Sequence, residues 1–333
     1  MGKTVTVYRG TKDGVIHSEQ NKVTLEPNDV FVEITHSGVC GADELFLKSG
    51  IVLGHEGIGI IRQIGENVTT VKIGDRVGFS FVQKVCGSCH NCLSGRDHYC
   101  IKKTQYGQDL QASGSFSHGA VRDASCIYAI PDGYPSEYAA PLMCAGATVW
   151  NVLTSNSIRP GDRVGVMGIG GLGHLAIKLG AAMGYQMVAI SSSKNKHDEA
   201  IELGASEHYL RDQMDQAAGD FKPLRHLILT GSPDTDYQKI LSFMDTDGAI
   251  YPLTSAQKPA PISLSSLNSR GIRIQGSMVA PRHSIKSLLQ FAAAKSIHPQ
   301  VMTFPLTKEG IEQALQKLRD GNMRYRGVLV RDQ

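Results

Sequence analysis

Four of the seven cysteines in this chain fall within one short stretch, and their spacing suggests metal binding. The stretch reads Cys-x-x-Cys-x-x-Cys, with a fourth cysteine after seven further residues. Four thiolates on one loop can close a tetrahedral zinc site, and a site filled by protein ligands is structural. Separate packing of the four thiols and a redox CxxC pair are poorer explanations. The predicted ligands are Cys86, Cys89, Cys92 and Cys100.

Three other metal-binding side chains, Cys40, His55 and Cys144, are scattered along the sequence. Two thiolates and one imidazole would leave a fourth tetrahedral position free, which is the arrangement of a catalytic zinc. The spacing alone does not connect these residues, because a lone histidine or cysteine more often packs in a core. A further cysteine, Cys126, belongs to neither set, and we interpret it as a core residue.

A glycine-rich turn lies between a predicted strand at 164–167 and a predicted helix at 172–183. In this position Gly170 allows the backbone to approach a pyrophosphate, and Gly173 allows close packing of helix on strand. The free N–H groups at the helix N-terminus then favour phosphate. The alternative is a glycine turn without a ligand. The predicted dinucleotide-binding glycines are Gly168, Gly170, Gly171 and Gly173.

The end of the next strand indicates which dinucleotide is bound. An NAD enzyme places a carboxylate there to accept from the ribose 2′-hydroxyl. This chain instead has the run SSSKNK at 191–196, which contains no carboxylate to repel a 2′-phosphate. The hydroxyls of Ser191 and Ser192 and the ammonium of Lys196 could bind that phosphate. The sequence therefore predicts NADP(H), and a solvated polar loop is the alternative.

The predicted elements fall into two patterns. The first third is β-rich: Val30, Val32 and Ile34 alternate with Phe31 and polar residues as in a half-buried strand. From Cys144 onward, strands alternate with helices, which predicts a parallel sheet. The early strands are predicted at 57–64 and 76–81. The later strands are predicted at 187–190, 227–229 and 249–253, the helices at 197–203, 237–244, 284–294 and 308–319, and a closing strand at 327–330.

Length and composition limit the class of protein. The 333 residues suggest about two domains. The formal charge of +3 comes without a long run of one sign, so we expect no nucleic-acid partner. The chain has no uncharged apolar run of membrane-spanning length and no leader-like start, so we expect no membrane association and a cytoplasmic location.

Several segments occur in the order found in one enzyme family. They are 38–43 (GVCGAD), 54–57 (GHEG), the four-cysteine loop and 141–150 (PLMCAGATVW). Over nearly its whole length the chain resembles the zinc-containing medium-chain alcohol dehydrogenases. The serine run and the segment NMRYR at 322–326 resemble the cinnamyl-alcohol-dehydrogenase-like branch in particular.

The resemblance implies an α/β fold with a GroES-like irregular β catalytic domain and a Rossmann domain that is a doubly wound parallel sheet. The catalytic domain would comprise 1–146 completed by 282–333, and the NADP-binding domain 147–281. A strand near 272–278 would join two chains as a homodimer. The cofactors would be NADP(H) and two Zn²⁺ per chain.

The resemblance also assigns roles to single residues. Cys40, His55 and Cys144 would bind the catalytic zinc, with Asp43 behind the imidazole and Glu56 as an occasional ligand. Thr148 would lie near the nicotinamide, and Arg326 would contact the pyrophosphate.

Two departures from the family pattern concern the substrate site. Ala42 stands where the family usually has the serine or threonine that passes a proton to the substrate oxygen, and Leu45 occupies another frequent relay position. The segment between Cys40 and His55 is also several residues shorter than usual. Phe46 and Trp150 suggest an apolar substrate only weakly.

We therefore expect an NADP-dependent zinc alcohol dehydrogenase or aldehyde reductase acting on a medium-sized apolar aldehyde. One alternative is reduction of a conjugated C=C bond or an iminium group, since such chemistry does not need the missing relay. A more remote alternative is a non-catalytic sensor that binds NADPH.

Overall fold

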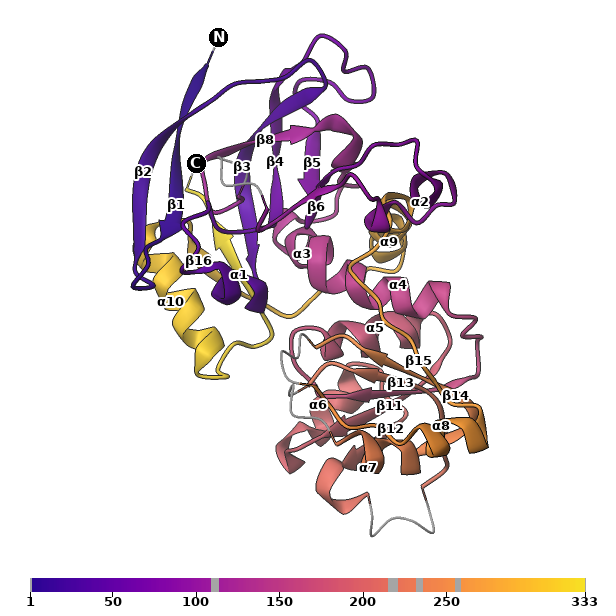
Figure 1. The fold of residues 1–333 in the computed structure, drawn as a ribbon. Helices are drawn as coiled ribbons and strands as arrows, with labels where there is room; N and C mark the ends of the chain where they lie inside the picture. The colour runs from indigo at the N-terminus through magenta and orange to yellow at the C-terminus, as the bar shows by residue number, and fades with distance from the viewer. Residues whose placement is uncertain (1, 109–113, 215–220, 232–235, 255–258, 333) are drawn as a thin grey trace. The chain divides into compact units, whose positions relative to one another are not determined.

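The computed structural model describes residues 2–108, 114–214, 221–231, 236–254 and 259–332 (Figure 1). They form two compact units. The first combines Met1–Ala147 with Val279–Gln333, and the second is Thr148–Met278. Each unit has its own sheet and its own buried apolar core.

The seven-stranded sheet of the first unit combines strands from early and late in the sequence (Figure 1). Strand β3 (Asp29–Val39) is antiparallel to β4 (Glu56–Ile64), and on its other edge to β8 (Gly119–Asp123) and β17 (Arg326–Val330). The last strand of the protein therefore lies beside the strand that leads into Cys40. The sheet continues with β5 (Arg76–Phe79) and β9 (Ile127–Ala129) beyond β4, and with β16 (Val301–Pro305) beyond β17.

The alternation predicted for residues 30–35 is wrong at Phe31, which is 1% exposed. A hairpin of β1 (Lys3–Gly10) and β2 (Ile16–Val23) packs a second apolar cluster, including Val7, against the side of β3 that the pattern assigned to solvent. The strand is therefore buried on both faces at this point.

Helices and short strands complete the first unit. Helix α10 (Lys308–Arg319) is preceded by its N-cap Thr307, whose hydroxyl accepts from the backbone N–H of Gly310. The short strands are β6 (Val82–Lys84) and β7 (Thr104–Gln105), and the helices are α1 (Gly41–Phe46), α2 (His90–Leu93), α3 (Ser136–Pro141), α9 (Arg282–Ala294) and α10 (Lys308–Arg319).

The second unit is built on a parallel sheet with strand order β12-β11-β10-β13-β14-β15. The order runs outward from β10 in both directions, which is the doubly wound arrangement, and ligands bind such sheets at the carboxyl ends of the strands near the reversal. The strands are β10 (Arg163–Met167), β11 (Gln186–Ser191), β12 (Glu207–Leu210), β13 (Leu224–Leu229), β14 (Met244–Pro252) and β15 (Arg273–Ile274). The helices are α4 (Ala147–Ser155), α5 (Gly173–Ala182), α6 (His197–Glu202), α7 (Tyr237–Ser242) and α8 (Leu264–Arg270).

Several predicted boundaries need correction. The strand predicted at 249–253 begins earlier, at Met244, and ends at Pro252. The strand predicted at 227–229 begins at Leu224. The helix predicted at 237–244 ends at Ser242, because β14 already begins at Met244. The strand predicted at 76–81 ends at Phe79, which is the last residue that pairs with β4 and β9. The strand predicted near 272–278 is limited to Arg273–Ile274, because glycine follows closely and weakens strands.

Candidate active site

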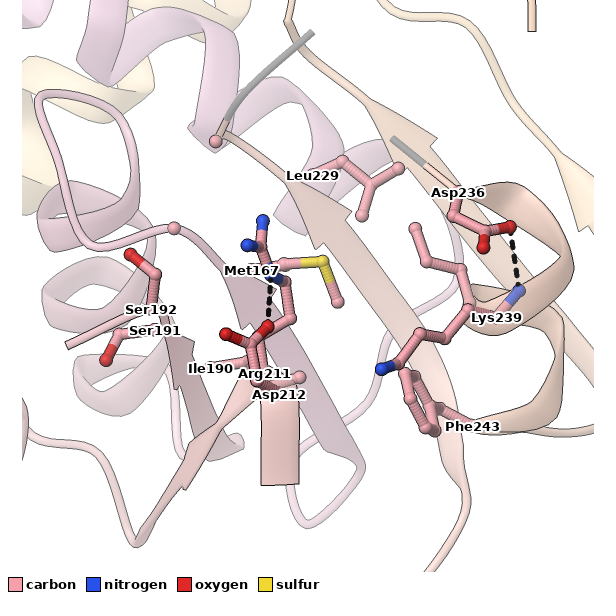
Figure 2. A pocket seen from close by; sticks show the side chains of 13 residues that line it. Met167, Ile190, Ser191, Ser192, Arg211, Asp212, Leu229, Asp236, Lys239 and Phe243 are labelled. Carbon is pink, nitrogen blue, oxygen red and sulfur yellow. Dashed lines mark hydrogen bonds and ion pairs between the residues drawn. The ribbon is translucent and has the colours of Figure 1, made fainter. Parts of the chain in front are cut away.

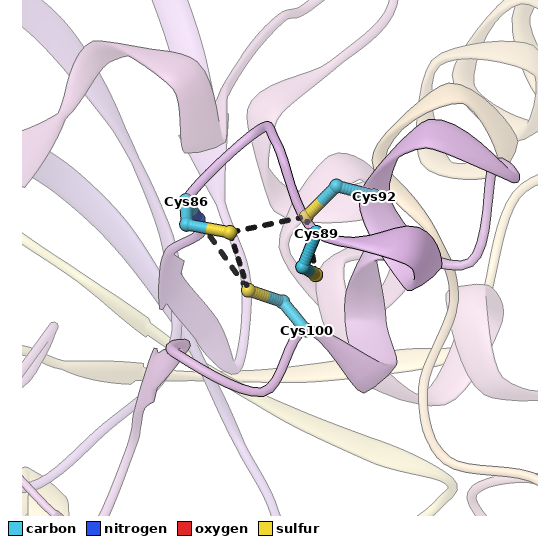
Figure 3. A group of neighbouring side chains, drawn as sticks. All are labelled: Cys86, Cys89, Cys92 and Cys100. Carbon is cyan, nitrogen blue, oxygen red and sulfur yellow. Dashed lines mark hydrogen bonds between the residues drawn. The ribbon is translucent and has the colours of Figure 1, made fainter.

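The four-cysteine loop brings its sulfur atoms together within one stretch of chain (Figure 3). After β6 the chain turns at Gly87, whose φ of 71° favours glycine. Two of the cysteines lie at and within the short helix α2, and the last follows a 3₁₀ turn. The sulfur–sulfur distances are 3.5 Å for Cys86–Cys100, 3.6 Å for Cys89–Cys92 and 4.0 Å for Cys86–Cys92.

These distances match the donor set of a tetrahedral zinc site. With Zn–S bonds near 2.3 Å, the edge of a regular tetrahedron is roughly 3.8 Å. Backbone N–H groups donate to the sulfurs of Cys86 and Cys89, which lowers the pKa of Cys86 to about 6 and that of Cys89 below its ordinary value. These two residues therefore favour the thiolate form that binds zinc. Burial raises the pKa of Cys92 to about 12. A bound cation would remove that remaining penalty, so the four residues fit zinc.

Cys126 lies beside this loop but outside the ligand set. Its side chain is fully buried and belongs to the apolar cluster that contains Val82, Val85 and Cys100. Burial raises the pKa of Cys126 to about 12, which keeps it a thiol. The interpretation of this residue as part of the core is confirmed.

A second cluster combines Cys40, His55, Glu56 and Cys144, whose ligand atoms lie within 4.8 Å of one another. Its residues come from three places in the fold. Cys40 lies between β3 and α1, His55 directly precedes β4, and Glu56 is the first residue of β4. Cys144 sits in a wide π-helical turn, Leu142–Gly146, of the kind that often occurs at functional sites.

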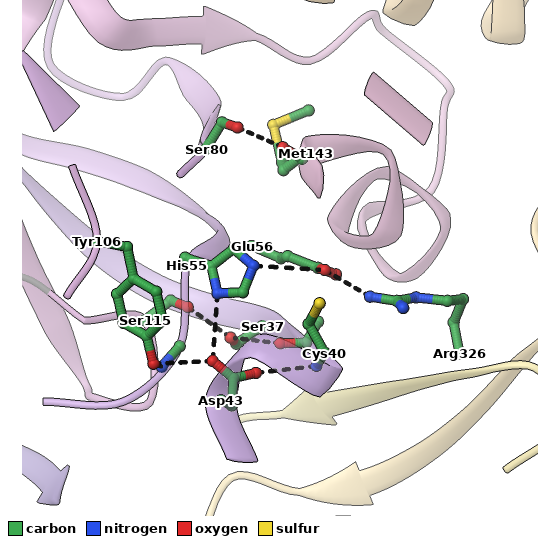
Figure 4. A network of polar contacts seen from close by, with 12 residues as sticks. Ser37, Cys40, Asp43, His55, Glu56, Ser80, Tyr106, Ser115, Met143 and Arg326 are labelled. Atoms are coloured by element: carbon green, nitrogen blue, oxygen red, sulfur yellow. Dashed lines mark hydrogen bonds and ion pairs between the residues drawn. The ribbon is translucent and has the colours of Figure 1, made fainter. Parts of the chain in front are cut away.

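The imidazole of His55 is fixed by a buried carboxylate (Figure 4). Its Nδ1 lies 3.2 Å from Oδ1 of Asp43, and the other oxygen of Asp43 accepts from the backbone N–H of Cys40 at 2.9 Å. Tyr106 donates to the same carboxylate at 2.9 Å, and its ring centroid lies 4.7 Å from that of His55. Sequence reasoning missed Tyr106, because nothing in its neighbourhood marks a buried tyrosine.

The Nε2 atom of His55 is buried and has no hydrogen-bond partner. With Nδ1 held by Asp43, the Nε2 lone pair is free to bind a metal. Burial opposes a charge on the imidazole, but Asp43 and the Cys40 sulfur together raise the pKa of His55 well above its ordinary value. The contact with the Cys144 sulfur lowers the pKa of Cys40 well below its ordinary value. The cluster collects negative charge and fits a divalent cation such as zinc.

Glu56 is held away from solvent by Arg326 (Figure 4). Their side chains form an ion pair at 2.5 Å, and both are buried. Burial raises the pKa of Glu56 to about 7, although the Arg326 guanidinium acts in the opposite direction. Gly38 permits this packing, since a Cβ there would lie 1.9 Å from a Glu56 oxygen. Arg326, predicted to contact a pyrophosphate, therefore has a carboxylate partner within the first unit.

The predicted relay positions carry no polar side chain in the structure either. Ala42 is partly exposed in the first turn of α1, and Leu45 is 57% exposed in the same helix.

The short connection after α1 is anchored by Arg9, which donates to the carbonyl of Gly50 at 2.9 Å. Phe46 packs edge-on against Tyr106 with centroids 5.1 Å apart.

In the second unit, the glycine-rich turn has the close contacts that such turns require. Gly168 has a φ of 102°, and a Cβ at Gly173 would lie 1.9 Å from the carbonyl oxygen of Gly168. A Cβ at Gly170 would meet nothing within 4 Å, so that position is open for a ligand. Gly171 lies in the same turn, and α5 starts two residues later, at Gly173. Thr148 lies in α4 at the start of the unit, and Trp150 is buried in the same helix.

A cavity of about 320 Å³ opens at the carboxyl ends of β10, β11 and β13 (Figure 2). Ser191 and Ser192, which are predicted to bind the cofactor, line it. Lys196 instead donates to the carbonyl of Ile169 in the glycine-rich turn at 2.5 Å. The cavity also contains Arg211, which the sequence reasoning missed because it lies after a different strand.

Two carboxylates border this cavity, and both are engaged with neighbouring groups. Asp212 lies 3.3 Å from the guanidinium of Arg211. Asp236 accepts from the backbone N–H of Lys239 at 3.2 Å and so caps α7. Neither lies at the end of β11, where a carboxylate would bind a ribose hydroxyl.

Comparisons with known proteins agree with this geometry. Residues 26–132 match the family described as alcohol dehydrogenase GroES-like domain, and residues 171–294 match the zinc-binding dehydrogenase family. The chain is 34% identical over 324 residues to a probable cinnamyl alcohol dehydrogenase of Oryza sativa subsp. japonica, covering 93% of this chain and 90% of that protein.

Two further proteins extend the likeness. An NADP-dependent alcohol dehydrogenase of Mycolicibacterium smegmatis is 31% identical over 346 residues, covering 98% of this chain and 97% of the relative. The solved structure of a cinnamyl alcohol dehydrogenase from Sorghum bicolor superposes with a TM-score of 0.91 at 26% identity, covering 98% of each chain.

The chain therefore belongs to the zinc-containing medium-chain alcohol dehydrogenase family, in its cinnamyl-alcohol-dehydrogenase-like branch. Its two units are the GroES-like and Rossmann-type folds of that family. Within the described ranges, no helix is long and apolar enough to cross a membrane.

Proposed function

We propose that this protein is a zinc-dependent alcohol dehydrogenase that uses NADP(H) to interconvert an aldehyde and its alcohol. The observation that carries the proposal is the open cluster of Cys40, His55 and Cys144, in which the buried Nε2 of His55 has no hydrogen-bond partner and lies 3.9 Å from Oε1 of Glu56. Relatives named as cinnamyl alcohol dehydrogenase and NADP-dependent alcohol dehydrogenase support it. The substrate class that we propose is a medium-sized apolar aldehyde.

Cys40, His55 and Cys144 would hold one zinc, and the four-cysteine loop would hold a second, structural one. Bound zinc supplies a Lewis acid for the carbonyl oxygen, and NADPH supplies the hydride. In the reducing direction the carbonyl carbon gains that hydride, its oxygen gains a proton, and NADP⁺ is released.

Side chains around the cluster orient the ligands. Asp43 holds the imidazole so that Nε2 faces the two sulfurs, and Tyr106 holds Asp43 in turn. Such partners fix the tautomer of a ligating histidine and raise its basicity. Arg326 compensates the charge of Glu56, which keeps that carboxylate beside the cluster in a buried place.

The second unit would bind the cofactor. The turn that contains Gly170 leads into α5, whose N-terminal N–H groups suit a pyrophosphate. The cavity beyond it would take the adenosine, with Arg211 as a cation near a phosphorylated ribose. Thr148 would lie near the nicotinamide. The pyrophosphate contact predicted for Arg326 would require its guanidinium to bind Glu56 and the pyrophosphate together.

The proton in this reaction has no side-chain donor at the usual positions. Ala42 carries a methyl group and Leu45 an apolar chain, so neither can pass a proton to the substrate oxygen. We propose that water donates it directly, with slower turnover than a hydroxyl relay would give.

The same departure favours a second candidate function, the reduction of a conjugated C=C bond or an iminium group. Hydride addition at a β-carbon or an iminium carbon does not require that proton path. We rank carbonyl reduction first, because the complete ligand set serves to polarise an oxygen.

One experiment separates the two reactions. The protein is incubated with NADPH deuterated at both C4 positions and an α,β-unsaturated aldehyde such as cinnamaldehyde, and NMR locates the deuterium. We expect deuterium on the carbinol carbon. Deuterium on the β-carbon with the aldehyde intact would instead establish conjugate reduction.

The cofactor assignment has its own test, which does not depend on turnover. Calorimetric titration with 2′,5′-ADP and with 5′-ADP compares the phosphorylated and unphosphorylated ribose directly. We expect 2′,5′-ADP to bind more tightly. Equal affinities would contradict the assignment of NADP(H).

We also propose a homodimer formed through the edge of the parallel sheet. Strand β15 ends that sheet, and an unpaired edge is a template for pairing with another chain. Light scattering coupled to size-exclusion chromatography should give twice the 36.0 kDa chain mass. A monomer at micromolar concentration would refute this.

A further inference from the structure

The hydroxyl of Ser191 is bonded within the fold, although the residue borders the cofactor cavity. Ser191 ends β11 and is only 3% exposed. Its hydroxyl donates to the carbonyl of Ser193 at 2.8 Å and lies 2.9 Å from Nε2 of His208. In Figure 2 the side-chain oxygens of Ser191 and Ser192 point in different directions.

These contacts use the full hydrogen-bonding capacity of Ser191. A hydroxyl has one proton to donate and two lone pairs to accept. The proton goes to the Ser193 carbonyl, and the backbone N–H of Ser193 donates back weakly at 3.4 Å. The contact with His208 must therefore be donated by its Nε2–H. No capacity remains at Ser191 for a phosphate oxygen.

The position of His208 on β12 allows its Nε2–H to donate to the hydroxyl of Ser191. It lies on β12 directly opposite Ala189 of β11, so its side chain shares a sheet face with Ser191 two residues on. The ring of His197 packs edge-on against it, with centroids 5.3 Å apart and planes at 76°. Burial and the neighbouring His197 lower the pKa of His208, which keeps the imidazole neutral with a single N–H.

We propose that His208 is a positioning residue that sets the preference for NADP(H) over NAD(H). By holding Ser191 inward it fixes the 191–193 turn, so that Ser192 is the hydroxyl presented to the ribose 2′-phosphate. The exposed Ser192 lines the cavity together with Arg211, which follows the strand that carries His208. This inference rests on the proposed use of NADP(H) and assigns Ser191 a framework role in place of direct contact with the phosphate.

The test measures the ratio of the dissociation constants of 5′-ADP and 2′,5′-ADP by calorimetry in the full-length protein. Replacing His208→Ala should lower the preference for 2′,5′-ADP by roughly threefold to tenfold, the range expected for one hydrogen bond. Ser191→Ala breaks the same bond from the other side and should lower it by a similar factor. In the double variant the preference for 2′,5′-ADP should be no lower than in either single variant, because both changes remove the same contact.

Two variants serve as controls. His208→Gln keeps an N–H donor near the Nε2 position and should keep the wild-type ratio. His226→Gln changes another buried histidine of the same sheet, bonded to Tyr251, and should leave the ratio unchanged. In His208→Ala, the ratio of the KM values for NADH and NADPH should change by the same factor as the ratio of the dissociation constants, while kcat with saturating NADPH stays the same.

The outcomes separate this inference from the proposed function. If wild type does not prefer 2′,5′-ADP, the use of NADP(H) itself is refuted. If wild type prefers it and His208→Ala keeps the ratio, only the role of His208 is refuted. A fall in the ratio for Ser191→Ala alone, with none for His208→Ala, would return Ser191 to direct phosphate contact and overturn the inference.

Discussion

The two metal-ligand clusters of the first unit are built in different ways. The cysteines of the loop come from one short segment, and backbone N–H groups stabilise their thiolates. Cys40, His55 and Cys144 come from the end of β3, the start of β4 and a π-helical turn. The first cluster depends on its own loop, whereas the second exists only when the sheet has formed.

The clusters also differ in the charges that surround them. The open cluster is enclosed by buried Asp43, Glu56 and Arg326, which together balance charge without solvent. In the part of the chain that the structure describes, no carboxylate lies within an ion-pair or hydrogen-bond contact of the loop sulfurs. A closed site needs only its four ligands, while an open site needs partners that orient the ligands and leave one position free.

The loop should be the more important of the two for stability. Cys100→Ser removes one of four thiolates, so zinc content should fall from two to one per chain. Because metal binding supplies folding energy to such loops, the Tm should drop by roughly 10 °C or more. Scanning calorimetry and metal analysis measure both changes.

Cys126→Ser is the matched control, since this buried cysteine packs beside the same loop. It should retain two zinc ions and lose less stability. If Cys126→Ser lowered the zinc content and Cys100→Ser did not, the assignment of ligands would be wrong.

The loop should also stabilise helix α9, which is distant from it in the sequence. Asp97, between two of the cysteines, accepts from the backbone N–H and the side chain of Arg282 at the start of α9, at 3.0 and 2.6 Å. Asp97→Ala should cost about 2–3 kcal/mol of unfolding free energy, because the partly buried guanidinium of Arg282 loses its charged partner and keeps the carbonyl of Ser125 as acceptor.

The exposed pair of Arg62 and Glu33 provides the comparison for Asp97. Arg62→Ala should change the unfolding free energy by less than about 1 kcal/mol. Urea unfolding of both variants measures the difference. Equal losses of unfolding free energy would mean that the Asp97–Arg282 pair stabilises the protein no more than an exposed ion pair does.

The open cluster should respond in rate rather than in stability. Ala42→Ser restores a hydroxyl to the first turn of α1 and should raise kcat for aldehyde reduction several-fold, up to about tenfold, through general acid catalysis. Ala42→Val is the control, because it adds bulk without a proton donor. An unchanged kcat in Ala42→Ser would show that proton transfer does not limit turnover.

A pH test examines a group that belongs to neither cluster. Burial lowers the pKa of His226, and the charges of Arg225 and Arg273 act in the same direction, while Asp162 opposes them. A histidine with a lowered folded pKa contributes its full stability above its unfolded pKa, near 6.5, and loses it as the pH falls. His226→Gln should therefore flatten the decline in unfolding free energy from pH 7 toward pH 5.

This should be the smallest of the four effects, since a single imidazole carries it. Chemical unfolding of zinc-loaded wild type and variant at several pH values measures the difference, and acid release of zinc affects both proteins alike. A steeper decline in the variant than in wild type would contradict the lowered pKa of His226.

Much of the fold could be predicted from local patterns. The helix at 308–319 and the βαβ alternation after Cys144 follow from periodicity, and the structure confirms them. Phe31 could not be placed, because the hairpin that covers it is a tertiary feature. The length of β15 likewise could not be predicted, because it depends on how many residues pair with β14, and the spacing of residues in the sequence does not determine that number.

The site shows the same division. The four-cysteine loop could be predicted from the sequence because its ligands lie close together in the chain. The open cluster could be predicted only from the resemblance to a known family. The roles of Tyr106 and His208 rest on side-chain contacts across 63 and 17 residues, and no sequence signal marks either residue. Arg326 was recognised, but its partner Glu56 became evident only when β17 was placed beside β3.

The most direct measurement is the zinc content of Cys144→Ala beside its activity and its Tm. If one closed and one open site exist, zinc should fall from two to one per chain, aldehyde reduction should be lost, and the Tm should change by only a few degrees. Two zinc ions retained in this variant, or activity retained with one, would contradict the assignment of Cys40, His55 and Cys144 as the catalytic centre.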